Sequence, residues 1–463
     1  MNPNSHVHKG CGAALQGCLF RSAKALRYRR FASTAGFVLF AVARVTAQSS
    51  ESLRLTLDDA QTRARETSHR LAEIDAMEAG ALAAVQAREA ASRPNVTAQA
   101  AYTRTNHIEE FVVPSLTGGA PRVLYPDIPD NYRTRLDLQW PIFSSGRSDA
   151  LVRAARSEAS ALASDRDAAR ADLRLEVARA YWALVTARAA VGVLEQALER
   201  AQAHVRDAGE RLKAGLTPPN ELASAEAMAA RQRVLLIETR NQRDIASSQM
   251  ARLVGVSLDR PIEPLELLAG GARGAGRASE AGGMRPEHVA LEFRLAAAEE
   301  RYEAALRGRR PSLAVAAGLD YARPNQRIFP LTSRWEDSWD AGVRLTWPLW
   351  DGGRVSADVA EALAAATAVR RRLEDFDAYT ALEARQRTLE LESSRAAVEA
   401  ADEGVRSATE ARRVTAERYA VGVATNTEVL DAQNALLQAE LDRTRTLAGV
   451  RLAEARLVRA AGQ

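Results

Sequence analysis

Two hydrophobic patterns alternate along this chain. The first places apolar residues three and four positions apart, which predicts long amphipathic helices. It is clearest between residues 177 and 212, where it holds for five heptads. This is the pattern of a coiled-coil seam, and its many alanines make the seam thin, with small side chains between the helices. A helix from about 148 to 212 would be roughly 97 Å long. The seam residues are Val177, Ala180, Leu184, Ala187, Val191, Leu194, Leu198, Ala201, Val205, Ala208 and Leu212.

The second pattern alternates apolar and polar residues, which predicts β-strands with one apolar face. It covers 132–140, 313–321 and 339–347. These strands fit either a half-buried sheet in a soluble sandwich or a transmembrane barrel with one face toward lipid. A length of about nine to eleven residues favours the barrel, and four strands would need copies from other subunits to close it. Aromatic residues stand near the strand ends, at Tyr132, Trp140, Trp339 and Trp347.

The whole order of elements occurs twice. Trp140-Pro141 and Gly146-Arg147 recur as Trp347-Pro348 and Gly353-Arg354, 207 positions later, whereas Arg93-Pro94 recurs as Arg310-Pro311, 217 positions later. Each unit therefore reads as an initial helix, two strands and a helical hairpin. We expect repeat 1 at 48–255 (helix 57–92, β-hairpin 96–140, helical hairpin 148–254) and repeat 2 at 286–463 (helix 287–309, β-hairpin 313–347, helical hairpin 355–462). The Gly- and Pro-rich segment 256–285 is expected to be a linker packed on the outside of the helices.

The N-terminus has a different composition. Residues 1–47 carry seven basic residues and no acidic ones, so the net charge of +4 becomes −3 without them. An apolar run at 31–42, followed by Val45-Thr46-Ala47, predicts a secretory signal peptide cleaved after Ala47. A transmembrane anchor is the rival interpretation, but the run is short for a bilayer. The basic excess belongs to this leader, so we expect no nucleic-acid binding.

The residues that carry enzyme chemistry are missing. The two cysteines, Cys11 and Cys18, lie in the leader, and His69, His107, His204 and His288 are isolated in the sequence. No nucleotide fingerprint, nucleophile elbow or paired metal-ligand spacing is present. We therefore expect no enzyme, no cofactor and no metal site.

The turns of the two helical hairpins are related by the repeat. Glu210, Arg211, Gly215 and Glu221 recur as Glu417, Arg418, Gly422 and Glu428, always 207 positions later. Glu428 and Asp431 are three residues apart and share one face of the outgoing helix. Acids at this position often only complement the helix dipole. We expect the turns to be the functional end of the molecule.

Together these features resemble the TolC-like outer-membrane efflux protein (outer membrane factor) family over nearly all of the chain after the leader. The matching residues are the doubled Arg-Pro and Trp-Pro landmarks and, most specifically, Arg418-Tyr419-x-Val421-Gly422 followed by Glu428-Val429-Leu430-Asp431-Ala432. The resemblance implies a mainly α fold with a transmembrane β-barrel portion. In it, a homotrimer with four strands per chain forms a twelve-stranded outer-membrane barrel, continued by a long periplasmic α-helical barrel.

The resemblance also implies roles for individual residues. Three copies each of Glu428 and Asp431, together with Glu221, would ring a pore constriction and attract cations. Tyr419 and Glu221 match two members of a polar network that holds some relatives shut, and Ala424 stands where that network has an arginine. Trp140, Trp347, Trp339 and Tyr132 are expected at the membrane interface. The tip residues expected to dock an adaptor are Ala214, Gly215, Leu216, Thr217, Val421, Gly422, Val423 and Ala424.

The implied function is a passive exit duct of a tripartite efflux pump that carries drugs or other toxic small molecules. Its partners would be a periplasmic adaptor (membrane fusion) protein, an inner-membrane transporter of the RND, ABC or MFS type, and outer-membrane lipid. Two alternatives stay open. One is the exit channel of a type I protein secretion system, which uses the same fold, and the other is a soluble periplasmic coiled-coil scaffold.

Overall fold

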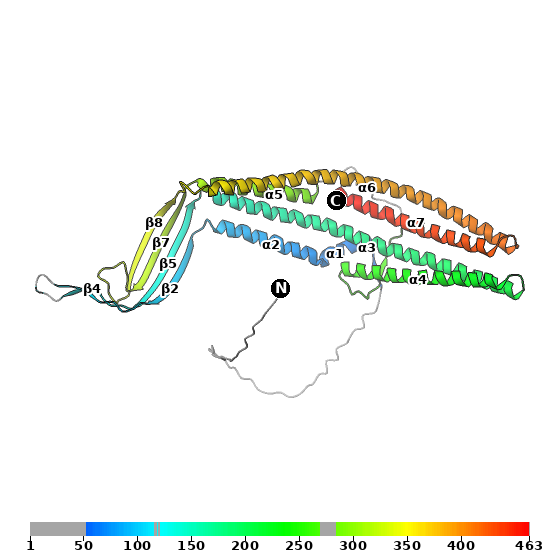
Figure 1. The fold of residues 1–463 in the computed structure, drawn as a ribbon, viewed down its shortest axis with the longest axis horizontal. Coiled ribbons are helices and arrows are strands. Elements are labelled where there is room, and N and C mark those ends of the chain that lie inside the picture. Colours follow the sequence, from blue (N-terminus) through cyan, green and yellow to red (C-terminus); the bar gives the residue numbers. More distant parts are fainter. Residues whose placement is uncertain (1–51, 115–117, 119–120, 269–283, 463) are drawn as a thin grey trace, which may run out of the picture. The chain divides into compact units, whose positions relative to one another are not determined.

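The computed structural model describes residues 52–114, 118, 121–268 and 284–462, so the expected signal peptide at 1–47 lies outside the described residues. Two helical hairpins make up most of this part (Figure 1). Helix α3 (Arg147–Lys213) is followed by α4 (Pro219–Leu253), and α6 (Arg354–Ala420) by α7 (Asn426–Ala460). The long helices have 67 residues each and the returning helices 35, so the two repeats match in length.

The initial helices differ from expectation. A single helix was expected at 57–92, but α1 (Leu57–Thr67) and α2 (His69–Ala90) are separate because Ser68 is extended. The Ser68 hydroxyl accepts the N–H of Leu71 at 3.3 Å and so caps α2. In the second repeat, α5 (Pro286–Leu306) continues into a short 3₁₀ turn. The break between α1 and α2 was not expected, because it depends on the single capping hydroxyl of Ser68.

Four long strands form one antiparallel sheet. Their order is β2 (Asn95–Arg104), β5 (Asp130–Phe143), β7 (Ser312–Arg323) and β8 (Glu336–Thr346), so β2 and β8 are the edges. The alternation seen in the sequence separates two faces of this sheet. The polar face carries an ion-pair network in which Arg133 Nε lies 2.6 Å from Asp320, and Arg135 contacts Asp137, Asp320 and Asp340.

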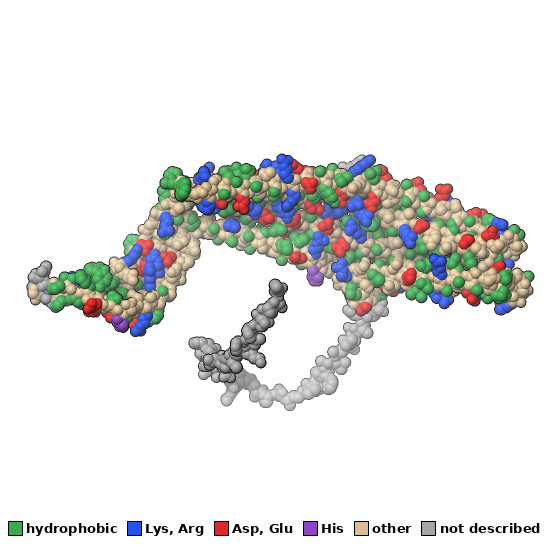
Figure 2. Space-filling view, viewed as in Figure 1, with side chains coloured by type: hydrophobic (Ala, Val, Ile, Leu, Met, Phe, Trp, Pro, Cys, Tyr) green, Lys and Arg blue, Asp and Glu red, His purple; other side chains and the backbone are tan. Residues whose placement is uncertain are grey.

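Two further strand pairs were not expected. Strands β1 (Leu53–Leu55) and β6 (Ile262–Pro264) pair in parallel, so part of the expected linker 256–285 is ordered sheet, and residues 269–283 lie outside the described chain. Strands β3 (Phe111–Val113) and β4 (Arg122–Tyr125) form an antiparallel hairpin between β2 and β5. Figure 2 shows hydrophobic side chains gathered around this hairpin.

The helical core is centred on α3. This helix packs against α1, α2, α4, α5 and α7, whereas α6 packs mainly against α5 and α7. The main apolar cluster surrounds Tyr181, whose hydroxyl donates to the carbonyl of Leu55 and accepts the N–H of Glu266. Nineteen residues of α3 are buried but only four of α6, namely Val355, Ala366, Leu391 and Tyr419. Leu391, in the stripe equivalent to that of α3, is buried, but α6 leaves other large apolar side chains exposed in a single chain, namely Leu363, Tyr379, Leu382, Leu389 and Val414.

Candidate functional site at the hairpin tips

Both hairpin turns have the same backbone geometry. Gly215 and Gly422 have φ angles of 71° and 76°, a left-handed conformation that favours glycine. Leu216 N–H donates to the carbonyl of Arg211 at 2.9 Å, and Val423 N–H donates to that of Arg418 at 2.9 Å. These bonds end each long helix in a Schellman motif. Since a 67-residue helix is roughly 100 Å long, the turns lie about that far from the start of α3 beside the sheet.

Tyr419 is the centre of the tip. Its side chain is only 6% exposed and packs with Ala424 and Val429. The guanidinium of Arg211 lies 4.4 Å from the ring centroid, and its Nη1 donates to the Tyr419 carbonyl at 3.2 Å. The hydroxyl donates to Glu221 at 3.4 Å. Burial, followed by the nearby charge of Glu221, raises the pKa of Tyr419, so the phenol stays a neutral donor.

A second contact joins the same two hairpins, this time through α7. Nε2 of buried His204 on α3 lies 2.7 Å from Oδ1 of Asn426 on α7. The Asn426 amide donates to the Glu221 carbonyl at 3.2 Å, so its oxygen faces the histidine and the ring nitrogen must be the donor. The ring of His204 also lies 5.4 Å from that of Tyr419. His204, expected to be an ordinary residue, thus helps to tie the first hairpin to the second.

The acidic residues of the two repeats are used differently. A carboxylate oxygen of Glu428 accepts the N–H of Thr425 at 2.7 Å, and the Thr425 hydroxyl accepts the N–H of Glu428 at 3.3 Å. This capping box gives Glu428 a structural role besides any role in a pore. Pro218 replaces the capping threonine in the first repeat, so Glu221 is free to accept from Tyr419. Asp431 is exposed and forms no ion pair within the described chain.

The expected docking residues do not all face outward. Leu216, Val421 and Val423 are large apolar side chains exposed on the turns. Ala424 is only 8% exposed because it packs against Tyr419 and Val429, so its expected place on the outer face is wrong. Of the remaining expected residues, Ala214, Gly215 and Gly422 are exposed and Thr217 is half-buried.

Three residues of this tip were missed from the sequence, namely Arg211, His204 and Asn426. For Arg211 a signal existed, because it is the repeat counterpart of Arg418. It supplies a cation to Tyr419 although Ala424 stands where the relatives' arginine is expected. His204 and Asn426 carry no local signal, since they are 222 positions apart.

Of the aromatic residues expected at a membrane interface, Tyr132, Trp140 and Trp339 lie on the apolar face of the sheet, and Trp347 directly follows β8. Tyr132, Trp140, Trp339 and Trp347 are all exposed in the single chain. Tyr132 packs against Tyr102 at 5.0 Å and against Trp335 at 5.8 Å between ring centroids. An apolar face opposite an ion-paired polar face is the side-chain division of a transmembrane barrel strand.

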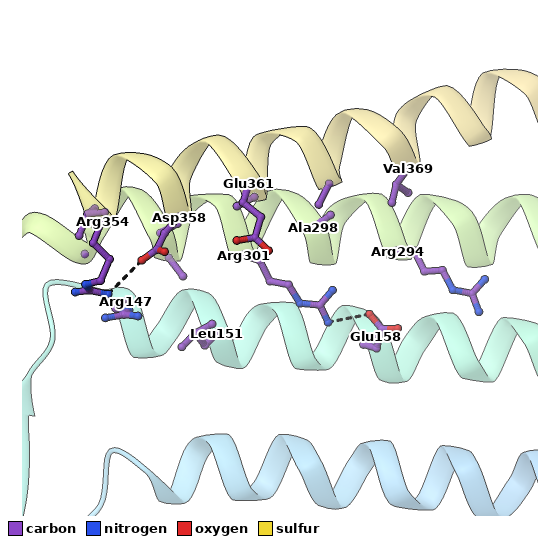
Figure 3. A pocket seen from close by; sticks show the side chains of 16 residues that line it. Arg147, Leu151, Glu158, Arg294, Ala298, Arg301, Arg354, Asp358, Glu361 and Val369 are labelled. Atoms are coloured by element: carbon purple, nitrogen blue, oxygen red, sulfur yellow. Dashed lines mark hydrogen bonds and ion pairs between the residues drawn. The ribbon is translucent and has the colours of Figure 1, made fainter. Parts of the chain in front are cut away.

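A cavity of about 520 Å³ lies where the two Gly-Arg landmarks meet, between α3, α5 and α6 (Figure 3). Its cations are largely paired, with Arg301 3.1 Å from Glu158 and Arg354 3.3 Å from Asp358. Alanines fill much of the remaining wall. We therefore regard it as a packing feature below the sheet. Across the described ranges, no group of three or more His, Cys, Asp or Glu side chains could hold a metal ion.

Comparisons with known proteins agree with this architecture. Structural similarity extends to the outer membrane protein VceC from Vibrio cholerae, at 23% identity, 88% coverage of this chain, 96% of that chain and a TM-score of 0.73. The CmeC outer membrane channel of Campylobacter jejuni matches at 17% identity over 88% of this chain and 85% of that one, with a TM-score of 0.74. Protein CyaE of Bordetella pertussis is 26% identical over 336 residues, which cover 70% of this chain and 69% of that protein.

The sequence pattern of the family described as outer membrane efflux protein matches residues 61–256 and 278–463, one match for each repeat. These comparisons confirm the expected fold, mainly α with a β portion and built from two repeats, and the outer-membrane location. They also identify a transport channel, which confirms that the protein is not an enzyme. The chain belongs to the outer membrane efflux protein family.

Proposed function

We propose that three copies of this chain form the passive outer-membrane exit duct of a tripartite efflux pump. The uncovered edges of one chain support the assembly. Strands β2 and β8 have no outer partner among the described residues, and an open sheet edge in lipid would leave backbone groups unsatisfied. On α6, the large apolar side chains Leu363, Tyr379, Leu382 and Leu389 are also exposed. Three copies would supply twelve strands, enough for a closed barrel around a lumen.

The tips are the proposed contact with a periplasmic adaptor. Leu216, Val421 and Val423 form an apolar surface on two turns of identical geometry. Large apolar side chains that are exposed together at the end of a helical hairpin are typical of a surface that another protein covers. The adaptor would connect the duct to an inner-membrane transporter, of the RND, ABC or MFS type, which supplies the energy.

The tip is also the proposed constriction. Glu428 and Asp431 are exposed on one side of α7, opposite the face that buries Asn426 and Val429. In a ring of three chains these carboxylates would repel one another and favour cations. Glu221 has a different proposed role, because it accepts the Tyr419 hydroxyl and its own carbonyl accepts Asn426.

The contacts of Tyr419 and His204 form the proposed latch. They join the α3–α4 hairpin to the α6–α7 hairpin at the tip, together with the ion pair between Arg200 and Glu440 at 2.8 Å. Any opening that moves the hairpins apart must break these bonds. The doubled turn with its inter-hairpin latch is the observation that carries the proposal of a gated duct.

The proposal is tested by drug susceptibility in a strain that lacks the gene. We expect the wild-type gene to restore resistance, and Gly215→Val or Gly422→Val to abolish it while trimers still assemble on unheated gels, because a β-branched residue cannot adopt the left-handed turn. Gly192→Val in the straight part of α3, where a Cβ meets no neighbour, is the control.

Other outcomes separate the alternatives. Loss of export of a secreted protein, with unchanged drug susceptibility, would favour the type I secretion channel. A chain recovered from the soluble periplasm, with no trimer in the outer-membrane fraction, would favour the coiled-coil scaffold and refute the duct.

A further inference from the structure

The edges of the sheet are a further interaction surface, and its partner is a second copy of this chain. Resting on the proposed assembly from three copies, we infer the register in which β8 of one subunit pairs with β2 of the next. Leu345 lies opposite Ala100 of the partner subunit, and Trp350 meets Val96 of the partner subunit. The evidence is the internal repeat, which the structure reproduces residue by residue.

The two repeats have the same strand pairing. In repeat 1, Asn95 on β2 is opposite Gln139 on β5. Adding 217 to the first number and 207 to the second, the two spacings of the sequence repeat, gives Ser312 opposite Thr346, which is the observed pair of β7 and β8. At the other end Arg104 opposite Asp130 becomes Tyr321 opposite Asp337, which is also observed.

The pairing between repeats is also visible once within the chain. β5 is the last strand of repeat 1, β7 is the first strand of repeat 2, and the two pair antiparallel. In a closed ring, β8 is the last strand of repeat 2 and would pair with β2, the first strand of repeat 1, in the partner subunit. This junction between copies is therefore equivalent to the β5–β7 junction within the chain. Shifting Leu138 opposite Ala317 by the two spacings gives Leu345 opposite Ala100 of the partner subunit. Shifting the bulged pair Phe143 and Leu313 gives Trp350, four residues after the end of β8 at Thr346, and Val96 of the partner subunit.

The faces of the strands agree with this register. Within the chain, Val96 lies opposite Leu138 and Ala98 opposite Leu136, so the even-numbered residues of β2 share the apolar face. The inferred register sets Ala100 and Tyr102 of the partner subunit against Leu345 and Val343, which lie on the apolar face of β8 opposite Leu313 and Val315 of β7. A slip by one residue would oppose apolar and polar faces. A slip by two would keep the faces but would no longer match the β5–β7 junction.

This register gives partners to side chains that lack them in one chain. Trp350 is 89% exposed and Val96 is 65% exposed. Tryptophan carries a large apolar surface, and such surface left in water marks an interface. The ionic contact between Arg135 and Asp320 at the β5–β7 junction corresponds to Gly342 and Thr103 of the partner subunit. At these two positions the β8–β2 junction between copies is therefore uncharged, whereas the β5–β7 junction within the chain has an ion pair.

Disulfide trapping in the full-length protein tests the register. The only cysteines are Cys11 and Cys18, within the expected leader, so engineered pairs stand alone in the processed chain. Leu345→Cys is combined in turn with Ala98→Cys, Ala100→Cys and Tyr102→Cys. Directly opposite residues have Cα atoms about 4.5–5.5 Å apart, within disulfide range, whereas residues two positions along lie about 7–8 Å away. Arg344→Cys with Ala101→Cys repeats the test on the polar face.

We expect oxidation to give covalent trimers for the Ala100 pair at least about fivefold more than for either slipped pair, with reversal by reductant. A maximum at Ala98 or Tyr102 would overturn the register and leave the proposed channel intact. Trimers on unheated gels without cross-links in any pair would overturn this strand seam. Absence of trimers in every preparation would refute the assembly, and with it the proposed function.

Discussion

Arg211 is the residue whose loss should open the tip. Its guanidinium stacks on Tyr419 and donates to the Tyr419 carbonyl, so it links α3 to α6. The stacking contact stabilises the closed tip by about 1 kcal/mol and the charged hydrogen bond by about 1.5 kcal/mol. The side chain is 22% exposed, which lowers the sum to about 2 kcal/mol per subunit. The pair with Asp207 lies within α3 and is unaffected by opening.

A free-energy loss of about 2 kcal/mol changes the closed-to-open ratio about thirtyfold for each subunit. We therefore expect Arg211→Ala to raise the conducting fraction of channels recorded in planar bilayers. Arg206→Ala is the matched control, because Arg206 is exposed on the same helix and has no ion pair in the described part of the chain. Unchanged conductance in Arg211→Ala, or an equal rise in the control, would refute a latch at this position.

Three further predictions concern selectivity, acid stability and the core. Glu428→Gln combined with Asp431→Asn should reduce cation selectivity, since glutamine preserves the helix cap; an unchanged reversal potential in a salt gradient would contradict this. Burial acts to raise the pKa of Glu287, but the hydrogen bond to Arg459, a backbone hydrogen bond and the nearby positive charges together lower it. The ionised carboxylate therefore stabilises the fold at neutral pH, and this stabilisation is lost as the pH falls through the folded pKa. Glu287→Gln should therefore show a smaller drop in thermal midpoint between neutral and acidic pH than wild type, as followed by circular dichroism. Leu184→Ala should cost about 3 kcal/mol, because Leu184 is fully buried in the α3 core, and a thermal midpoint equal to wild type would contradict that packing.

The long helices and three of the four main strands could be predicted because their signals are local, whereas β2 (Asn95–Arg104) was expected only as the repeat counterpart of β7. The heptad seam between Val177 and Leu212 and the alternation around Trp140 and Trp347 each fix an element without reference to distant residues. The repeat then supplied the order of elements and both turns. The break at Ser68 was missed because one hydroxyl caps the second helix within an otherwise continuous helical pattern.

The missed features depend on residues far apart in the chain. Strand β6 forms only because Ile262 pairs with Leu53, and three residues without that partner give no strand signal. The tip network likewise joins His204 to Asn426 across 222 positions. The sequence placed Ala424 on the outer face of the turn, but a small apolar residue next to Tyr419 is better accommodated inside. Contacts of this kind follow from tertiary packing and not from periodicity.

The most direct test of the duct is whether Asp431 lines the conducting path at the tip. Asp431→Cys would place three thiols on the axis of the trimer, in a processed chain without other cysteines. Thiolates are strong ligands for soft divalent metals. The account predicts that Cd²⁺ added on the tip side blocks the current of Asp431→Cys channels, with recovery after chelation, and leaves wild-type channels unaffected. A current through Asp431→Cys channels that ignores Cd²⁺ would contradict a constriction at this position.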